Sequence, residues 1–136
     1  METKIEMTAE QALANYLECD IEDAESQIES GGYLVLNDKE ADEAAREHIK
    51  DSVWAFRASF ILSECDLDFS GEASLESIQG NSCESANDFI LSLVEKTCGL
   101  DEFVKSAISA DGRGHFLSGY DGCEIEQDAY FIYRLN

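Results

Sequence analysis

Residues 129–135, Ala129-Tyr-Phe-Ile-Tyr-Arg-Leu135, decide the fold of this 136-residue chain. Aromatic and β-branched residues dominate the stretch, which is typical of a β-strand. The apolar run Tyr33-Leu-Val-Leu36 predicts a second, short and buried strand. Pairing the two would leave one small sheet packed against helices. The predicted class is therefore α+β: a mostly helical single domain over residues 1–136, with a small antiparallel sheet that includes the C-terminal strand.

Helical periodicity occupies most of the remaining chain. It predicts helices over about 9–17, 18–30, 38–63, 85–98 and 101–110. Two capping-box patterns support the first and third helices, Thr8 with Gln11 and Asn37 with Glu40. Residues 65–81 are predicted to be irregular apart from one helical turn at 74–78. In the helix over 85–98, the predicted inward side chains are Phe89, Leu93 and Val94.

The strongest feature beyond the fold is charge. The chain carries 30 Asp and Glu against 9 Lys and Arg, a formal net charge of -21 with a pI near 4.1. Repulsion between these charges opposes folding, and proteins that tolerate it often use the resulting field. A charge of this size corresponds to ~35 Å of duplex DNA, close to the expected diameter of a compact domain of this length. The charge therefore suits a DNA-like surface that binds a basic, nucleic-acid-binding protein, whereas free nucleic acid and anionic membranes would be repelled.

The predicted partner-binding residues lie in two helical stretches, where carboxylates recur every three or four residues like phosphates on a rigid backbone. An alternative is a solvated face that only provides solubility, and another is adaptation to high salt. The gradient of charge along the chain favours a binding face in its N-terminal half. The eleven candidates are Glu18, Asp20, Glu22, Asp23, Glu25, Glu29, Asp38, Asp42, Glu43, Glu47 and Asp51.

Cysteine usage and hydropathy indicate the compartment. The five cysteines are scattered, odd in number and form no CxxC pair, which favours free thiols over a disulfide framework or a zinc site. The acidic N-terminal residues lack the apolar segment of a signal peptide, and no apolar run approaches the ~18 residues of a membrane span. We therefore expect a protein of a reducing cytoplasm, and we expect no cofactor.

One segment resembles a metal-binding motif. Asp66-Leu-Asp-Phe-Ser-Gly71 has the opening of an EF-hand calcium loop. The twelfth position, which should be a bidentate Glu, is Ser77, and the large aliphatic residue expected at position eight is Ala73. An ordinary acidic turn is the favoured interpretation, so no metal site is predicted.

The Gly-rich segment near the C-terminus carries the residue types of a hydrolase. His115, Ser118 and Asp121 lie close together in sequence, whereas catalytic triads are assembled from separated elements. No G-x-S-x-G motif is present, and the Asp111-Gly-Arg-Gly114 turn is too short for a phosphate loop. These patterns predict no catalytic residues and a non-enzymatic protein.

Two stretches resemble segments of known proteins: Arg113-Gly-His-Phe-Leu-Ser-Gly-Tyr-Asp-Gly122 with the C-terminal Tyr130-Phe-Ile-Tyr-Arg-Leu-Asn136, and Ser52-Val-Trp-Ala-Phe-Arg-Ala-Ser-Phe-Ile61. They are similar to small acidic proteins of bacteriophages and related mobile elements. The resemblance implies a viral gene product that acts in a bacterial host, and supplies no catalytic residues. By analogy, such proteins include anti-restriction and anti-CRISPR inhibitors that imitate DNA.

The sequence thus leads to a first hypothesis and two alternatives. The first is a phage-encoded inhibitor of a host defence system that acts as an acidic DNA mimic and blocks a nucleic-acid-binding channel. The second is a protein–protein adaptor that binds through an exposed aromatic patch around Trp54, which could also support a homodimer. The third is a weak calcium-binding module.

Overall fold

The computed structural model describes residues 7–136, so most of the N-terminal segment that argues against a signal peptide lies outside the described residues. The chain forms two compact units. The sheet unit combines residues up to Ala45 with Gly112–Asn136, and the helical unit spans Arg46–Asp111. The division falls inside helix α3, Asp38–Asp51. The expected single domain over 1–136 stays a prediction, because two compact units can still unfold in one cooperative transition.

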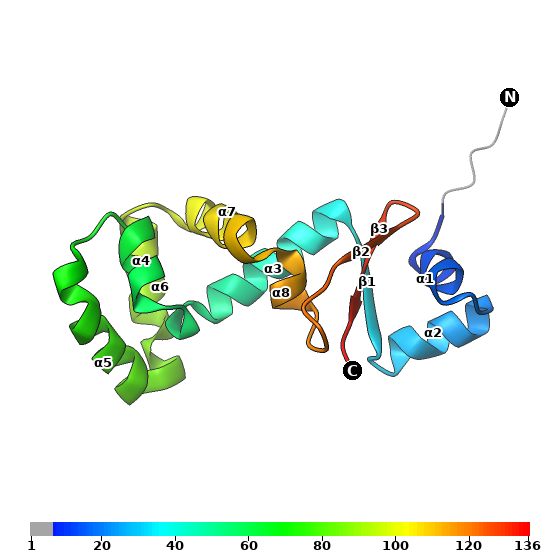
Figure 1. Ribbon diagram of the computed structural model, residues 1–136, viewed down its shortest axis with the longest axis horizontal. Coiled ribbons are helices and arrows are strands. Elements are labelled where there is room, and N and C mark those ends of the chain that lie inside the picture. Colours follow the sequence, from blue (N-terminus) through cyan, green and yellow to red (C-terminus); the bar gives the residue numbers. More distant parts are fainter. Residues whose placement is uncertain (1–6) are drawn as a thin grey trace, which may run out of the picture. The chain divides into compact units, whose positions relative to one another are not determined.

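The sheet unit contains three antiparallel strands in the order β1-β3-β2 (Figure 1). Strand β1 (Tyr33–Asn37) pairs with the C-terminal strand β3 (Tyr130–Arg134), with Val35 opposite Ile132. The remaining elements are mainly helical. The predicted α+β class, with a small antiparallel sheet that includes the C-terminal strand, is therefore confirmed.

The edge strand β2 (Ile125–Gln127) is absent from the sequence-based prediction. It joins β3 through a tight turn in which Asp128 and Ala129 both have positive φ, 53° and 67°. Two-residue hairpin turns of this kind are usually recognised in a sequence by Asn-Gly or Asp-Gly. Here the second residue is alanine, so the sequence lacks that signal. A tertiary hydrogen bond stabilises this turn instead: the side-chain amide of Asn15 donates to the Asp128 carboxylate at 2.8 Å.

Helices cover both faces of the sheet (Figure 1). Helices α1 (Ala9–Leu17) and α2 (Ile21–Glu29) pack on the face formed by Val35 and Ile132. The first half of α3 and the short helix α8 (Arg113–Leu117) lie on the opposite face. The sheet therefore separates two helical layers within this unit.

Local capping signals determine where these helices begin. Thr8 and Gln11 exchange the two hydrogen bonds of a capping box, and Asn37 and Glu40 do the same at the start of α3. Both predicted capping boxes are confirmed. The carboxylate of Asp20 caps α2 by accepting a hydrogen bond from the Asp23 amide at 2.8 Å.

The helical unit is built from short helices around an aliphatic and aromatic core. Phe103 is fully buried and its ring packs against those of Phe56 and Phe60, with centroids 5.3 and 5.4 Å away. Ile61, Ile90 and Val94 are also fully buried. The elements that follow α3 are η1 (Val53–Ala55), α4 (Ala58–Glu64), η2 (Phe69–Gly71), α5 (Glu72–Ser82), η3 (Cys83–Ala86), α6 (Asn87–Lys96) and α7 (Leu100–Asp111).

The predicted long helix over 38–63 is wrong, because α3 ends at Asp51 and α4 starts at Ala58. At this break, backbone groups that no longer form helical hydrogen bonds are bound by two side-chain amides from distant helices. The Gln79 side chain donates to the carbonyls of Trp54 and Phe56 at 2.8 and 2.6 Å. The Asn87 side chain accepts from the Trp54 amide and donates to the carbonyl of Lys50. Helical periodicity continues across the break, so local sequence could not reveal it.

Two further expectations for the helical unit are wrong. Residues 72–82 form the 11-residue helix α5, where only one turn was predicted. Phe89 is 56% exposed instead of inward, because Ile90 and Val94 occupy the core-facing side of α6. Val94 points inward as predicted, and Leu93 is half-buried.

Glycine is required where α8 packs against the chain that leads into β2. A Cβ on Gly114 would lie 2.5 Å from the carbonyl oxygen of Gly122 and 2.8 Å from the Glu124 nitrogen. Both obstacles are backbone atoms, so they cannot move aside as a flexible side chain would.

We predict that Gly114→Ala lowers the free energy of unfolding by about 1–3 kcal/mol, through overpacking. Gly80→Ala in helix α5 is the matched control, because a Cβ there meets no atom within 4 Å. The control should be neutral or stabilising by up to ~1 kcal/mol, since alanine favours helix. Urea denaturation of both variants makes the measurement. Equal stability of Gly114→Ala and the parent would contradict the close packing of α8.

Candidate functional site

The layer formed by α1 and α2 carries an uncompensated negative charge. From residue 7 to residue 38 the chain contains no Lys, Arg or His. Within this layer, all six predicted carboxylates between residues 18 and 29 are exposed. A seventh, Glu10, is half-buried in the first turn of α1. The charged side chains of this layer are therefore all anionic.

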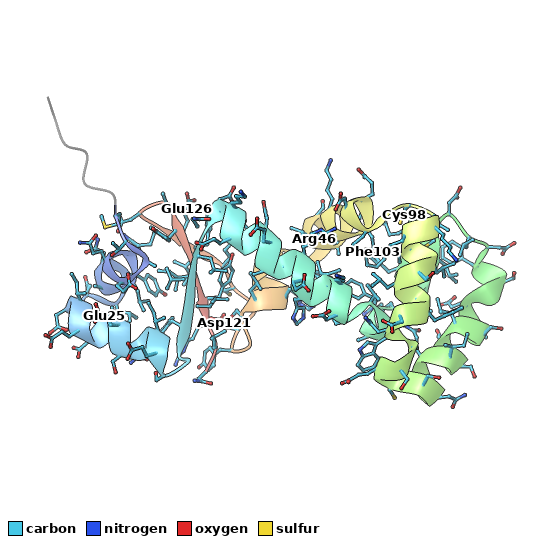
Figure 2. The ribbon with its side chains drawn as sticks, turned by 180° about the vertical axis from the view of Figure 1, so that it is seen from behind. Glu25, Arg46, Cys98, Phe103, Asp121 and Glu126 are labelled. Carbon is cyan, nitrogen blue, oxygen red and sulfur yellow. The ribbon has the colours of Figure 1, made fainter. Side chains whose placement is uncertain are left out.

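Helix α2 orders part of this surface into a row. Glu22, Glu25 and Glu29 fall within about 60° of one another on an ideal helix. Ala24 is fully buried and packs on the other side of α2, so the row faces away from the core, and Figure 2 shows Glu25 on this helix. Asp23 is also exposed but lies on another side of the helix.

Two of the eleven predicted residues have structural roles next to this row. Asp20 is the N-cap of α2, and Glu18 adopts the left-handed conformation that ends α1, with φ of 56°. The sequence could have revealed the role of Asp20, since Asp before a periodic apolar run is a common N-cap. Changes at these two positions would therefore disturb helix boundaries as well as charge.

The five predicted residues on α3 belong to a different environment. All are exposed, but Lys39, Arg46 and Lys50 lie between them on the same helix. Glu43, Glu47 and Asp51 recur every four residues, about 6 Å apart along the axis. Asp38 and Asp42 lie on the far side of the sheet from α2, where both bind Arg113. The structure thus separates the α2 carboxylates from those at the start of α3.

Arg113 forms the main ion cluster of the sheet unit, and sequence reasoning missed it. Its side chain is only 10% exposed. Nη1 lies 2.9 Å from Asp38 Oδ1 and 3.0 Å from Asp42 Oδ1, and Nε lies 2.8 Å from Glu124 Oε1. The guanidinium also stacks over the Phe131 ring, 4.5 Å from its centroid. Burial alone would lower the pKa of Arg113, but hydrogen bonds with Glu124 and Asp38 raise it.

Arg113→Lys should lower the free energy of unfolding by about 1.5–3 kcal/mol, because a single ammonium cannot reproduce the forked contacts to Glu124 and to α3. Arg46→Lys is the matched control. Arg46 pairs with Asp101, whose side chain is 87% exposed, so this change should cost less than ~0.5 kcal/mol. Chemical denaturation compares the two. Similar losses in both variants would mean that the Arg113 cluster contributes no more than a surface pair.

Tyr133 extends the cluster into the core. It is fully buried, and its hydroxyl donates to Glu124 Oε1. Burial and this hydrogen bond raise the pKa of Tyr133 above its ordinary value. An unfolded chain would ionise this tyrosine near pH ~10, whereas the folded protein keeps the proton. Its contribution to stability is therefore complete below pH ~10 and is lost progressively as pH rises from there towards the raised pKa of the folded state.

We predict that the melting temperature falls as pH rises from 9 to 11, and that Tyr133→Phe makes this fall shallower. The variant should melt lower than the parent at pH 8, since Glu124 loses one of its two donors and keeps only Arg113. Tyr120→Phe is the control, because Tyr120 is exposed and should leave the pH slope unchanged. An unaltered slope in Tyr133→Phe would show that another group causes the alkaline loss. Calorimetry at several pH values provides the data.

An open groove of ~780 Å³ lies where α1 turns into α2. Met7, Ala14 and Ile21 supply apolar lining, while Asp20 and Glu22 place carboxylates in its wall. Glu22 also belongs to the α2 row. The groove and the row are therefore parts of one surface.

The calcium-like segment has a different geometry from an EF-hand loop. The Asp68 carboxylate accepts a hydrogen bond from the Ser70 amide at 2.8 Å, which lowers the pKa of Asp68. Helix α5 begins at Glu72, only six residues after Asp66. Within residues 7–136, no group of three or more His, Cys, Asp or Glu side chains is arranged to hold a metal ion. The segment is an acidic turn that leads into a helix.

The residues that resemble a catalytic triad form a turn. The Ser118 hydroxyl lies 2.9 Å from Asp121 Oδ1 and 2.7 Å from the carbonyl oxygen of Arg134. Asp121 also accepts from the Cys123 amide, and these hydrogen bonds lower the pKa of its carboxyl. His115 is exposed and its ring packs edge-on against Phe116. Ser118 and Asp121 therefore serve to hold the chain between α8 and β2.

Comparison with protein-family models, curated proteins and solved structures gave no significant match. No helix in the described part of the chain is long and apolar enough to cross a membrane. The functional assignment consequently depends on the chemistry of the surface itself.

Proposed function

We propose that this protein is a non-enzymatic inhibitor that binds a basic, nucleic-acid-binding protein through the anionic layer of α1 and α2, in the place of nucleic acid. The observation that carries the proposal is the absence of any basic side chain between residues 7 and 38, where six exposed carboxylates lie between residues 18 and 29. A surface that only needed solubility would tolerate interspersed lysines.

The spacing of charge supports the comparison with DNA. Helix α2 has nine residues and carries four carboxylates, Glu22, Asp23, Glu25 and Glu29. Nine residues extend ~14 Å, which gives one negative charge per ~3.4 Å of axis. One strand of duplex DNA carries its phosphates at the same axial density, ~3.4 Å. Counted over the whole helix, with Asp23 included, α2 therefore offers a basic channel the charge density of one DNA strand.

The groove beside the row suits the side chains of such a partner. Lysine and arginine bury an aliphatic stem and keep a charged head at a polar rim. The apolar lining from Met7 and Ile21 would contact the stem, and Asp20 and Glu22 would pair with the head. Long-range attraction between the two charged surfaces would also speed association.

The class of target comes from the resemblance to bacteriophage and mobile-element proteins predicted from the sequence, and not from the comparisons with known proteins. This resemblance favours a host defence nuclease or surveillance complex, so that the inhibitor would act as an anti-restriction or anti-CRISPR protein in the bacterial cytoplasm. Blocking a DNA channel requires no catalysis and no cofactor.

The test is capture of partners from a bacterial lysate on the immobilised protein, at ~50 mM and ~500 mM salt. We expect a basic nucleic-acid-binding protein at low salt, released by high salt and by added duplex DNA, because screening weakens exposed charge pairs. Partners that resist both salt and duplex would contradict the proposal.

A charge-neutralised variant locates the surface. Glu22→Gln, Glu25→Gln and Glu29→Gln together should weaken partner binding about ten-fold or more, as expected for three exposed charge pairs. The matched control removes the same charge from α3, with Glu43→Gln, Glu47→Gln and Asp51→Asn, and should bind within about three-fold of the parent. Circular dichroism checks that both variants fold. Equal losses in the two variants would mean that only total charge matters.

A second candidate function is a protein–protein adaptor, favoured by exposed aromatic side chains in the helical unit. Phe69 and Phe89 are the most exposed of these, whereas Trp54 is half-buried and donates its backbone amide to Asn87. Binding through these rings would persist at high salt. Phe89→Ser, which lies outside the packed core, distinguishes this candidate: it should leave binding by the α2 row unchanged and abolish an aromatic contact.

A further inference from the structure

Strand β1 is an edge of the sheet, because β3 is its only neighbour among the strands of the described chain (Figure 1). In an antiparallel ladder, alternate residues direct their N–H and C=O groups toward the neighbouring strand. The Leu135 amide donates to the Gly32 carbonyl at 3.0 Å, which fixes this alternation. Leu34 therefore directs its backbone groups to β3, whereas Tyr33 and Val35 direct theirs to the other side.

These outward backbone groups, two N–H donors and two C=O acceptors, have no hydrogen-bond partner within residues 7–136. Backbone polar groups that are buried away from water are almost always paired. Four unpaired groups on neighbouring positions therefore indicate an edge that water reaches. Such an edge is a template for a further strand.

Strand β1 also lacks the features by which sheet edges usually avoid a further strand. Those features are charged side chains, proline, bulges and very short strands. The five residues of β1, Tyr33-Leu-Val-Leu-Asn37, include no charge and no proline, and their register with β3 is continuous. The other edge, β2, has three residues with Glu126 at its centre. Of the two edges, β1 is thus the one suited to pairing.

The charge around this edge determines which kind of strand it would accept. Residues 7–45 contain eleven Asp and Glu and one basic residue, Lys39. Glu29 at the end of α2 and Glu40 in the first turn of α3 are exposed and flank β1 in the chain. A second copy of this protein would bring the same negative charge to the edge and be repelled. A segment rich in Lys and Arg would be attracted.

We propose that the free edge of β1 binds an extended segment of a partner protein that is rich in Lys and Arg, and that this segment adds to the sheet as a fourth strand. Its backbone would bond to the four free groups of Tyr33 and Val35, and its basic side chains would pair with the carboxylates that flank β1. Main-chain hydrogen bonds supply much of the affinity in this mode of recognition. The proposal is independent of nucleic acid: it would stand even if the α2 row bound no nucleic-acid-binding protein.

Amide hydrogen exchange of the parent chain, followed by NMR, tests the edge directly. In the free protein, the amides of Tyr33 and Val35 should exchange about ten-fold or more faster than those of Leu34 and Leu36, which β3 protects. The probe is a synthetic peptide of alternating lysine and valine. At ~1 mM it should slow exchange at Tyr33 and Val35 by about ten-fold or more and leave Leu34 and Leu36 unchanged.

A peptide of alternating lysine and proline, with the same number of lysines, is the matched control. Proline keeps the charge of the peptide but removes every second N–H, so it cannot form the ladder. This control should bind about ten-fold or more weakly than the lysine–valine peptide.

A pair of variants tests the same edge from the side of the protein. Tyr33→Pro removes an outward N–H without breaking a hydrogen bond to β3, a position where sheets tolerate proline. Tyr33→Val is the control, because it loses the same ring but keeps the N–H. The proline variant should bind the lysine–valine peptide about ten-fold or more weakly than the valine variant. If the proline variant does not fold, exchange in the parent chain decides.

Four results would overturn the proposal. They are slow exchange at Tyr33 and Val35 in the free protein, exchange that the lysine–valine peptide does not alter, equal affinity for the two peptides, and equal affinity of the two folded variants. Slow exchange in the free protein that becomes fast on dilution would assign the edge to a second copy of this chain instead.

Discussion

The sheet unit depends on Arg113, a single cation that lies among three carboxylates. Arg113 contacts Asp38 and Asp42 at the start of α3 and Glu124 before β2, while its guanidinium covers Phe131 on the sheet. In a chain with a net charge of -21, these carboxylates could not approach one another without such a partner. The sheet face opposite α2 is thus stabilised by local neutralisation, and the face under α1 and α2 by apolar packing together with the hydrogen bond from Asn15 to Asp128.

This division separates the carboxylates by role. Those at Asp38, Asp42 and Glu124 are held by Arg113, and Asp20 caps a helix. The row on α2 has neither role: it stands on a helix whose other side is buried, with no basic residue in its layer. Repulsion between the carboxylates of such a row lowers the stability of the protein. A partner with basic side chains would neutralise this charge on binding, which is what we expect of an interface. For this reason we place the proposed interface on α2 rather than on all eleven predicted residues.

The sequence predicted those parts of the fold that depend on interactions between residues close together in the chain. The two strands, the capping boxes at Thr8 and Asn37, and the exposed acidic helix over 18–30 follow from alternation, capping chemistry and periodicity. The end of α3 at Asp51 could not be predicted, because Gln79 and Asn87 bind its backbone from distant helices. Arg113 was also missed, since it stands between two glycines in a segment that resembles a plain turn. For the candidate site, the sequence could predict which residues are acidic and exposed. It could not predict that the sheet separates α2 from Asp38 and Asp42.

We propose that the anionic layer occupies the place of nucleic acid on its partner. The most direct measurement is a competition assay, in which the captured partner binds a labelled duplex while the concentration of this protein is raised. We expect mutual exclusion: the apparent affinity for duplex falls in proportion to the added protein, and excess duplex restores binding. A ternary complex of partner, duplex and this protein, with duplex affinity unchanged, would contradict it.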